Sequence, residues 1–133
     1  MKNRCPYYVS VVVPLYNEED NVVILHQRIS DVLKKLDRPY EIILVDDGST
    51  DATRARMRLL AESDPACKVI LFRSNFGQSA AMAAGFKKSD GSIVIAMDGD
   101  LQNDPRDIPA LLEKIEEGYD VVAGWRKNRQ DKL

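Results

Sequence analysis

The chain has 133 residues, of which 44% are hydrophobic and 30% are charged, and its formal net charge at pH 7 is −2. This length and composition predict a single globular domain over residues 1–133, long enough to bury a core of its own. The small negative charge gives no support for nucleic acid as a partner, and no apolar run approaches the ~20 residues that cross a bilayer, so a cytoplasmic chain is expected.

Apolar runs of strand length alternate with helical patterns along the chain. Residues 9–13 predict a first strand, and apolar positions at steps of three and four over 22–36 predict a first helix. Strand and helix patterns then alternate over residues 42–45, 51–62, 69–72, 80–84 and 93–97. Asp104 and Pro105 predict the start of a last helix that Gly118 ends, before a fifth strand at 120–124. The alternation predicts an α/β fold with a mostly parallel sheet of about five strands and helices on both faces.

Polar or aromatic residues follow every predicted strand. In open parallel sheets, ligands bind beyond the carboxyl ends of the strands. The segments at those ends are 14–18, 46–51, 73–78, 98–102 and 124–126. Their composition predicts one binding site that is assembled from loops far apart in the sequence.

Three oxygen-bearing side chains follow the fourth predicted strand at alternate positions: Asp98, Asp100 and Gln102. Oxygen ligands at this spacing suit one hard cation, such as Mg²⁺ or Mn²⁺, and leave coordination positions for the oxygens of a diphosphate. A solvated acidic turn would have the same sequence, so the metal-site interpretation depends on the residues at the other strand ends.

Several common site motifs are absent from the sequence. There is no Gly-x-Gly-x-x-Gly and no Walker loop after the first strand, which removes the main support for dinucleotide and P-loop binding. The single histidine, His26, lies inside the first predicted helix, and Cys5 and Cys67 lack a Cys-x-x-Cys spacing. We expect a structural or surface role for His26, and buried or free thiols in a reducing compartment.

Four segments carry a family resemblance: VSVVVPLYNEE at 9–19, ILVDDGSTD at 43–51, RSNFG at 73–77 and MDGDLQNDP at 97–105. Together they resemble the family 2 glycosyltransferases, which have the Rossmann-like GT-A fold. The resemblance is greatest to the polyprenyl-phosphate sugar transferases, of the dolichol-phosphate mannosyltransferase and undecaprenyl-phosphate glucosyltransferase type. It extends from about residue 8 to the end of the chain.

The resemblance implies roles for individual residues. Those implied in nucleotide binding are Pro14, Tyr16, Asn17, Glu18, Asp46, Asp47, Asp98 and Gly99. The implied metal ligands are Asp98, Asp100 and Gln102, and the implied catalytic residues are Asp98, Asp100 and Arg126, the last lying near the phosphates of donor or acceptor. Two alternatives stay open: Asp46 and Asp47 as a turn and helix cap, and Arg126 as a solvated residue.

The implied reaction is a metal-dependent, inverting transfer of a sugar from UDP-glucose or GDP-mannose to a polyprenyl phosphate. The resemblance alone favours uridine as the base. Family catalytic domains continue past the fifth strand, so we expect this chain to be the donor-binding part of a truncated domain. The missing part would supply any contact with a membrane surface, and the exposed sheet edge leaves a homodimer open.

Two other functions remain open on the sequence. A non-catalytic nucleotide- or metal-binding module would reuse the same half of the fold, and an immediate stop after Leu133 in the gene would favour it. A nucleotidyltransferase that acts on sugar phosphates would also be α/β and Mg²⁺-dependent. Such an enzyme normally has a Gly-rich, basic first loop, whereas residues 14–19 are acidic.

Overall fold

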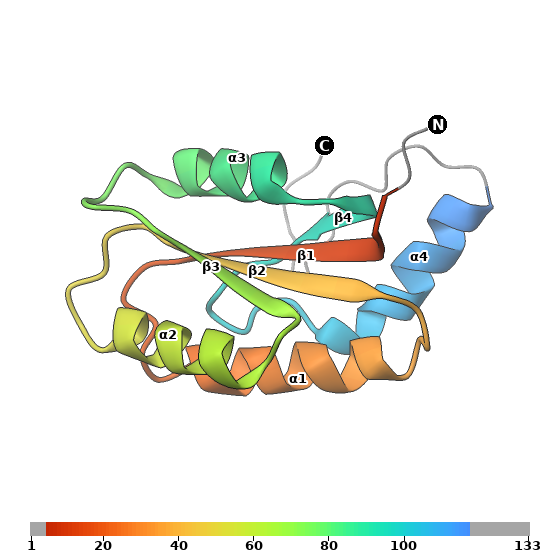
Figure 1. Ribbon diagram of the computed structural model, residues 1–133, viewed down its shortest axis with the longest axis horizontal. Coiled ribbons are helices and arrows are strands. Elements are labelled where there is room, and N and C mark those ends of the chain that lie inside the picture. Colours follow the sequence, from red (N-terminus) through yellow and green to blue (C-terminus); the bar gives the residue numbers. More distant parts are fainter. Residues whose placement is uncertain (1–4, 118–133) are drawn as a thin grey trace.

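The computed structural model describes residues 5–117 (Figure 1), so the expected strand at 120–124 and Arg126 lie outside the described residues. Within this range the elements are β1 (Tyr7–Leu15), α1 (Val22–Lys34), β2 (Tyr40–Asp46), α2 (Thr53–Ser63), β3 (Cys67–Leu71), α3 (Gln78–Lys88), β4 (Gly91–Ala96), the short 3₁₀ helix η1 (Pro105–Asp107) and α4 (Ile108–Glu116). The expected alternation is confirmed here. β1, β2 and α3 extend beyond both expected ends. In contrast, α1 ends at Lys34 instead of residue 36, α2 begins at Thr53 instead of residue 51, and β3 and β4 each end one residue earlier than expected.

The strands form one parallel sheet in the order β3-β2-β1-β4. Leu15 of β1 lies opposite Asp46 of β2, which in turn lies opposite Leu71 of β3. These strands therefore end at the same edge, and β4 runs beside β1 in the same direction. The expected α/β fold with a parallel sheet is confirmed in the described range.

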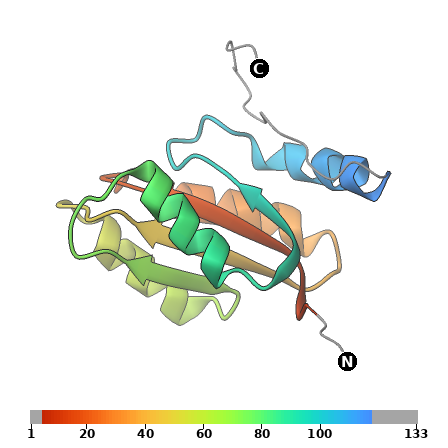
Figure 2. The same cartoon turned by 90° about the horizontal axis from the view of Figure 1, so that it is seen from above.

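Helices cover both faces of the sheet, with α3 on one face and α1 and α2 on the other (Figures 1 and 2). Side chains alternate between the faces along each strand. In β1, Val11 and Val13 therefore pack with Leu25 and Ile29 of α1, while Val12, between them, belongs to the smaller core under α3. The central strands β1 and β2 are buried on both faces and are apolar over most of their length.

The helix α3 packs closely against the sheet at Gly85. A Cβ atom at this position would lie 2.2 Å from Cγ1 of Val12. We expect Gly85→Ala to lower the free energy of unfolding by about 1–3 kcal/mol, because overpacking displaces neighbouring groups; urea denaturation measures this loss. Adding Val12→Ala should relieve the contact, so the double variant should lose less stability than the sum of the two single variants. Strict additivity would contradict the close packing.

A buried polar network joins the strands near their amino ends. The carboxylate of Glu41 is fully buried and accepts hydrogen bonds from Ser10 Oγ (2.6 Å), Lys68 Nζ (2.6 Å) and the backbone N–H of Asp90 (2.7 Å). Burial by itself would raise the pKa of Glu41, but the bonds from Lys68, Ser10 and Asp90 together hold that pKa below its ordinary value of 4.5. The bond to Glu41 also raises the pKa of Lys68.

The single histidine contacts an aspartate of another segment, and the two cysteines are free thiols. His26 Nε2 lies 2.7 Å from an Asp64 carboxylate oxygen, a contact that joins α1 to the connection between α2 and β3. Cys5 is exposed and Cys67 is buried, both are free thiols, and burial raises the pKa of Cys67 to about 12.

In the described part of the chain, no helix combines the length and the apolar character that crossing a membrane requires.

Candidate functional site

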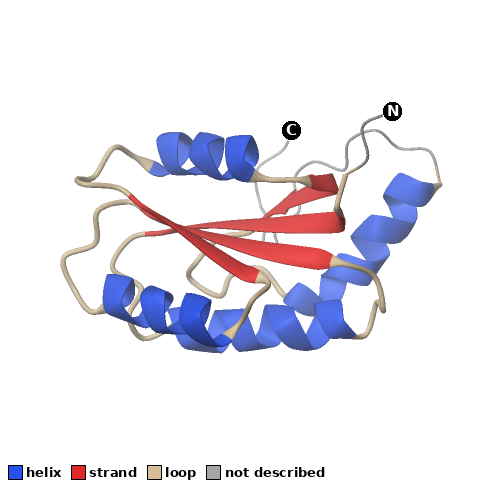
Figure 3. Ribbon diagram, viewed as in Figure 1, coloured by secondary structure: helices blue, strands red, loops and turns tan. Residues whose placement is uncertain are grey.

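The loops that follow the strands lie at the carboxyl edge of the sheet (Figure 3). Residues of these loops and of the neighbouring element ends line a pocket of about 200 Å³. The residues that line it are Pro14, Leu15, Tyr16, Glu18, Asp47, Gln78, Asp98, Gly99 and Asp100. The structure thus brings together residues from the segments 14–18, 46–51, 73–78 and 98–102. The expected assembly of one site from distant loops is supported by this pocket.

The loop after β4 presents Asp98 and Asp100 to the pocket. It is closed on itself, because the backbone N–H of Asp98 donates to Asn103 Oδ1 at 2.7 Å. The carboxylate of Asp100 accepts from the backbone N–H of Gln102 at 3.2 Å. Leu101, between them, has a left-handed φ of 66°, which is uncommon for a branched side chain and is often found at functional sites.

Gly99 sets the distance between this loop and the end of β1. A Cβ atom at Gly99 would lie 2.4 Å from Cδ2 of Leu15 and 2.9 Å from the backbone oxygen of Pro14. We expect Gly99→Ala to push the loop away from β1, which would weaken nucleotide binding in the presence of Mn²⁺ and lower stability by about 1–3 kcal/mol. Calorimetric titration and thermal unfolding measure the two effects. Unchanged values for both would contradict the close approach of Gly99 to β1.

The chemistry of the pocket fits a hard cation in part. Asp98 and Asp100 supply carboxylate oxygens to the same pocket, whereas Gln102 is not among its lining residues. Mg²⁺ is commonly held by one or two carboxylates together with the phosphates of a substrate. The described residues contain no group of three or more His, Cys, Asp or Glu side chains placed to hold a metal ion. A cation held by Asp98 and Asp100 would therefore also need oxygens from the phosphates of a bound nucleotide. The role of Gln102 as a metal ligand stays a prediction.

The end of β1 and the loop that follows it contribute Pro14, Tyr16 and Glu18 to the pocket, while Asn17 connects two loops. Asn17 Oδ1 accepts from the backbone N–H of Thr50 at 2.8 Å, and its own backbone N–H donates to Ser49 Oγ at 2.8 Å. These bonds join the β1–α1 loop to the β2–α2 turn. Nucleotide contacts by these four residues remain predictions.

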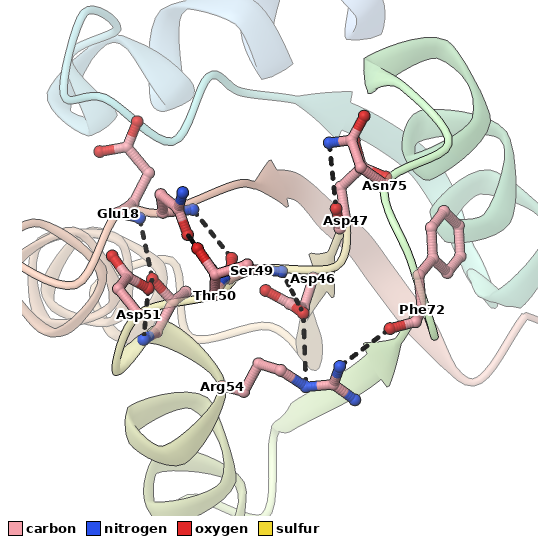
Figure 4. A network of polar contacts seen from close by, with 11 residues as sticks. Glu18, Asp46, Asp47, Ser49, Thr50, Asp51, Arg54, Phe72 and Asn75 are labelled. Carbon is pink, nitrogen blue, oxygen red and sulfur yellow. Dashed lines mark hydrogen bonds and ion pairs between the residues drawn. The ribbon is translucent and has the colours of Figure 1, made fainter.

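The adjacent residues Asp46 and Asp47 have different surroundings (Figure 4). Asp46 is fully buried, accepts from the backbone N–H of Ser49 at 3.1 Å, and lies 3.5 Å from Nε of Arg54. Its other oxygen, Oδ1, is buried without a hydrogen-bond partner among the described residues. Asp46 is not a lining residue of the pocket, so contact between its side chain and a base would require the turn to open.

Asp47 lines the pocket and also holds the loop after β3. Its carboxylate accepts from the backbone N–H groups of Phe76 (2.7 Å) and Gly77 (3.0 Å) and from Nδ2 of Asn75 (3.1 Å). A base that bonds to Asp47 would share these oxygens with the loop or displace the loop. Through these contacts with Asp47, Asn75 and Gly77 shape the loop after β3.

Gln78 was missed as a site residue at the sequence level. It is the first residue of α3, it lines the pocket, and its Nε2 donates to Asp98 Oδ1 at 3.3 Å. The feature of the sequence that could have identified Gln78 is its position as the last residue of the segment 73–78, after β3. Its direction toward Asp98 depends on the loop bonded to Asp47.

A larger hollow of about 570 Å³ lies elsewhere, between α1 and the segment 101–106. Arg28, Asp31 and Lys35 line it on the helix side, and Arg106 on the other side is paired with Asp104 at 2.8 Å. None of its lining residues comes from the segments 14–18, 46–51 or 73–78. The smaller pocket, where the strand ends converge, is therefore the candidate ligand site.

The family follows from comparison with known proteins. A family model described as Glycosyl transferase family 2 matches residues 10–133. The chain belongs to glycosyl transferase family 2. Within this family, the chain is 48% identical over 124 residues to the undecaprenyl-phosphate 4-deoxy-4-formamido-L-arabinose transferase of Serratia proteamaculans. That match covers 92% of this chain and 38% of the relative, so the chain spans well under half of the relative's length.

Two solved structures of glycosyltransferases resemble the fold. Glucosyl-3-phosphoglycerate synthase from Mycobacterium tuberculosis, in complex with UDP, matches with a TM-score of 0.67 and 26% identity over 84% of this chain and 41% of the other. A mannosyltransferase from Pyrobaculum calidifontis, in complex with GDP-Man and Mn²⁺, matches with a TM-score of 0.60 and 28% identity over 78% of this chain and 30% of the other. The family 2 assignment and the GT-A type of fold are thus confirmed.

Proposed function

We propose that this chain binds the nucleotide and the cation of a nucleotide diphosphate sugar, as the donor-binding part of a polyprenyl-phosphate sugar transferase. The observation that carries the proposal is the pocket at the carboxyl edge, where Asp98 and Asp100 face the same space as Tyr16 and Asp47. The similarity to an undecaprenyl-phosphate sugar transferase supports the lipid phosphate as acceptor. The neighbour that holds GDP-Man and Mn²⁺ supports a divalent cation, Mg²⁺ or Mn²⁺.

The reaction that we propose is an inverting transfer of the sugar to a polyprenyl phosphate. Asp98 and Asp100 would hold the cation, which when bound offsets the negative charge that develops on the departing diphosphate. Pro14, Tyr16 and Glu18 would border the base and ribose. A phosphate acceptor is already an anion, so the demand on a general base is modest. Arg126 would bind phosphate oxygens through its guanidinium group.

The donor that we propose is a UDP-sugar. One similar structure holds UDP and another holds GDP-Man, so the comparisons are compatible with either base. The preference for uridine comes from the resemblance of the sequence segments. As the transferred group we propose a hexose or a related sugar.

Calorimetric titration of UDP and GDP into this chain tests the proposal. We expect one of the two, UDP by preference, to bind at least tenfold more tightly with Mn²⁺ than with EDTA, equivalent to ~1.4 kcal/mol. CMP, which lacks the diphosphate, serves as a control that should show little dependence on the cation. Failure of both UDP and GDP to bind, or equal binding in EDTA, would contradict the proposed donor site.

A further inference from the structure

Gln78 occupies a position that the sequence resemblance did not assign. Its side chain is exposed at the start of α3, lines the pocket, and donates through Nε2 to Oδ1 of Asp98 at 3.3 Å. We infer that Gln78 is a positioning residue, which orients the carboxylate of Asp98 toward the cation of the donor. This inference rests on the proposed function, because it concerns the cation that the proposed donor would bring into the pocket.

The start of α3 is held in place by contacts on both sides of Gln78. Before it, the backbone N–H of Gly77 donates to the carboxylate of Asp47 at 3.0 Å. After it, the backbone N–H of Ala81 donates to the carbonyl of Gly77 at 3.1 Å, which closes the first turn of the helix. Ala81 itself is fully buried against the sheet. These contacts fix the position of the Gln78 backbone, from which the side chain reaches Asp98.

The chemistry of the contact suits a positioning role. Carboxylates that bind metals are commonly held by hydrogen bonds from neighbouring groups, which fix their direction. The amide Nε2 of Gln78 is a donor and carries no charge, so it orients Asp98 without competing electrostatically with a cation. The distance of 3.3 Å is at the long end of the range for a hydrogen bond.

Gln78→Met removes the hydrogen-bonding group and keeps the length of the side chain and a high helix propensity. The experiment measures UDP affinity by calorimetry over a series of Mn²⁺ concentrations, with GDP used instead if the unmodified chain prefers it. We expect the Mn²⁺ concentration for half-maximal nucleotide binding to rise about tenfold. The thermal midpoint should stay unchanged, because the exposed side chain of Gln78 is not part of the core. Any loss of nucleotide affinity in EDTA should be much smaller than the loss in Mn²⁺. The matched control is Ser79→Ala, at the next exposed position of α3, and it should behave as the unmodified chain.

The possible outcomes separate the inference from the proposed function. If the unmodified chain needs Mn²⁺ and Gln78→Met needs no more of it, the positioning role of Gln78 is overturned and the proposed function stands. If Gln78→Met weakens nucleotide binding equally in Mn²⁺ and in EDTA, the positioning role is also overturned, because such a loss indicates direct nucleotide contact or a structural effect. If the unmodified chain binds nucleotide equally with and without Mn²⁺, both the inference and the proposed use of a cation are wrong.

Discussion

Asp100→Asn is expected to weaken Mn²⁺-dependent nucleotide binding by about tenfold or more, which corresponds to ~1.4 kcal/mol. Asp100 lines the pocket together with Asp98, and the loss of one carboxylate removes both a charge and a strong oxygen ligand for the cation. Asparagine keeps the side-chain oxygen that accepts from the backbone N–H of Gln102 at 3.2 Å, so the turn itself should be retained. Calorimetric titration in Mn²⁺ and in EDTA measures the effect.

The control for this prediction is Asp107→Asn. Asp107 lies in η1, close in sequence to Asp100, but is not among the residues that line the pocket. Its substitution removes the same charge from the protein and should leave nucleotide affinity unchanged in both conditions. Equal losses for the two variants would indicate a general electrostatic effect, and an unchanged Asp100→Asn variant would remove Asp100 from the metal site.

Lys68→Met is expected to lower the free energy of unfolding by about 3 kcal/mol, because it leaves the charge of Glu41 without its cation. The side chain of Glu41 is 0% exposed, whereas that of Lys68 is 31% exposed. Glu41→Gln should therefore cost less, about 1.5 kcal/mol, since the remaining Lys68 ammonium group stays in contact with water. Urea denaturation of both variants and of the double variant measures the difference. A larger loss for Glu41→Gln than for Lys68→Met would contradict this account of the pair.

The same pair predicts how stability depends on pH. The pKa of Glu41 in the fold is below 4.5, so its contribution is present above pH 4.5 and is lost as the pH falls through the lowered pKa. The pKa of Lys68 is above 10.5, so its contribution is present below pH 10.5 and is lost as the pH rises through the raised pKa. The stability difference between the unmodified chain and Glu41→Gln should therefore be largest between these limits. A difference that grows below pH 4.5 would contradict the sign of the Glu41 effect.

The sequence predicted the elements of the fold because each depends on a local pattern. A strand that is buried on both faces is a continuous apolar run, and the run at 9–13 corresponds to β1. A helix that is buried on one face has apolar residues at steps of three and four, and the stripe at 22–36 corresponds to α1. The order of the strands, β3-β2-β1-β4, was not predicted, because it depends on which helix covers which face. The fifth strand at 120–124 lies outside the described residues and stays a prediction.

The candidate site was predicted less completely, because side-chain direction depends on contacts between distant segments. Asp46 and Asp47 are identical in type, adjacent and both buried, yet only Asp47 lines the pocket, because side chains alternate in direction along an extended chain. The carboxylate of Asp47 bonds to Gly77, 30 residues away, and this contact fixes the start of α3. The role inferred for Gln78 depends on that contact, which no local pattern reveals.

The most direct test of a cation and nucleotide site at the carboxyl edge uses the paramagnetism of Mn²⁺. Backbone amide signals of the ¹⁵N-labelled chain would be recorded by NMR while Mn²⁺ is added in the presence of saturating UDP. We predict strong broadening of the signals of Tyr16, Gln78, Gly99 and Asp100, and little change at Glu41, near the amino ends of the strands. Broadening centred instead on the hollow between α1 and residues 101–106, or no localised broadening, would contradict the account.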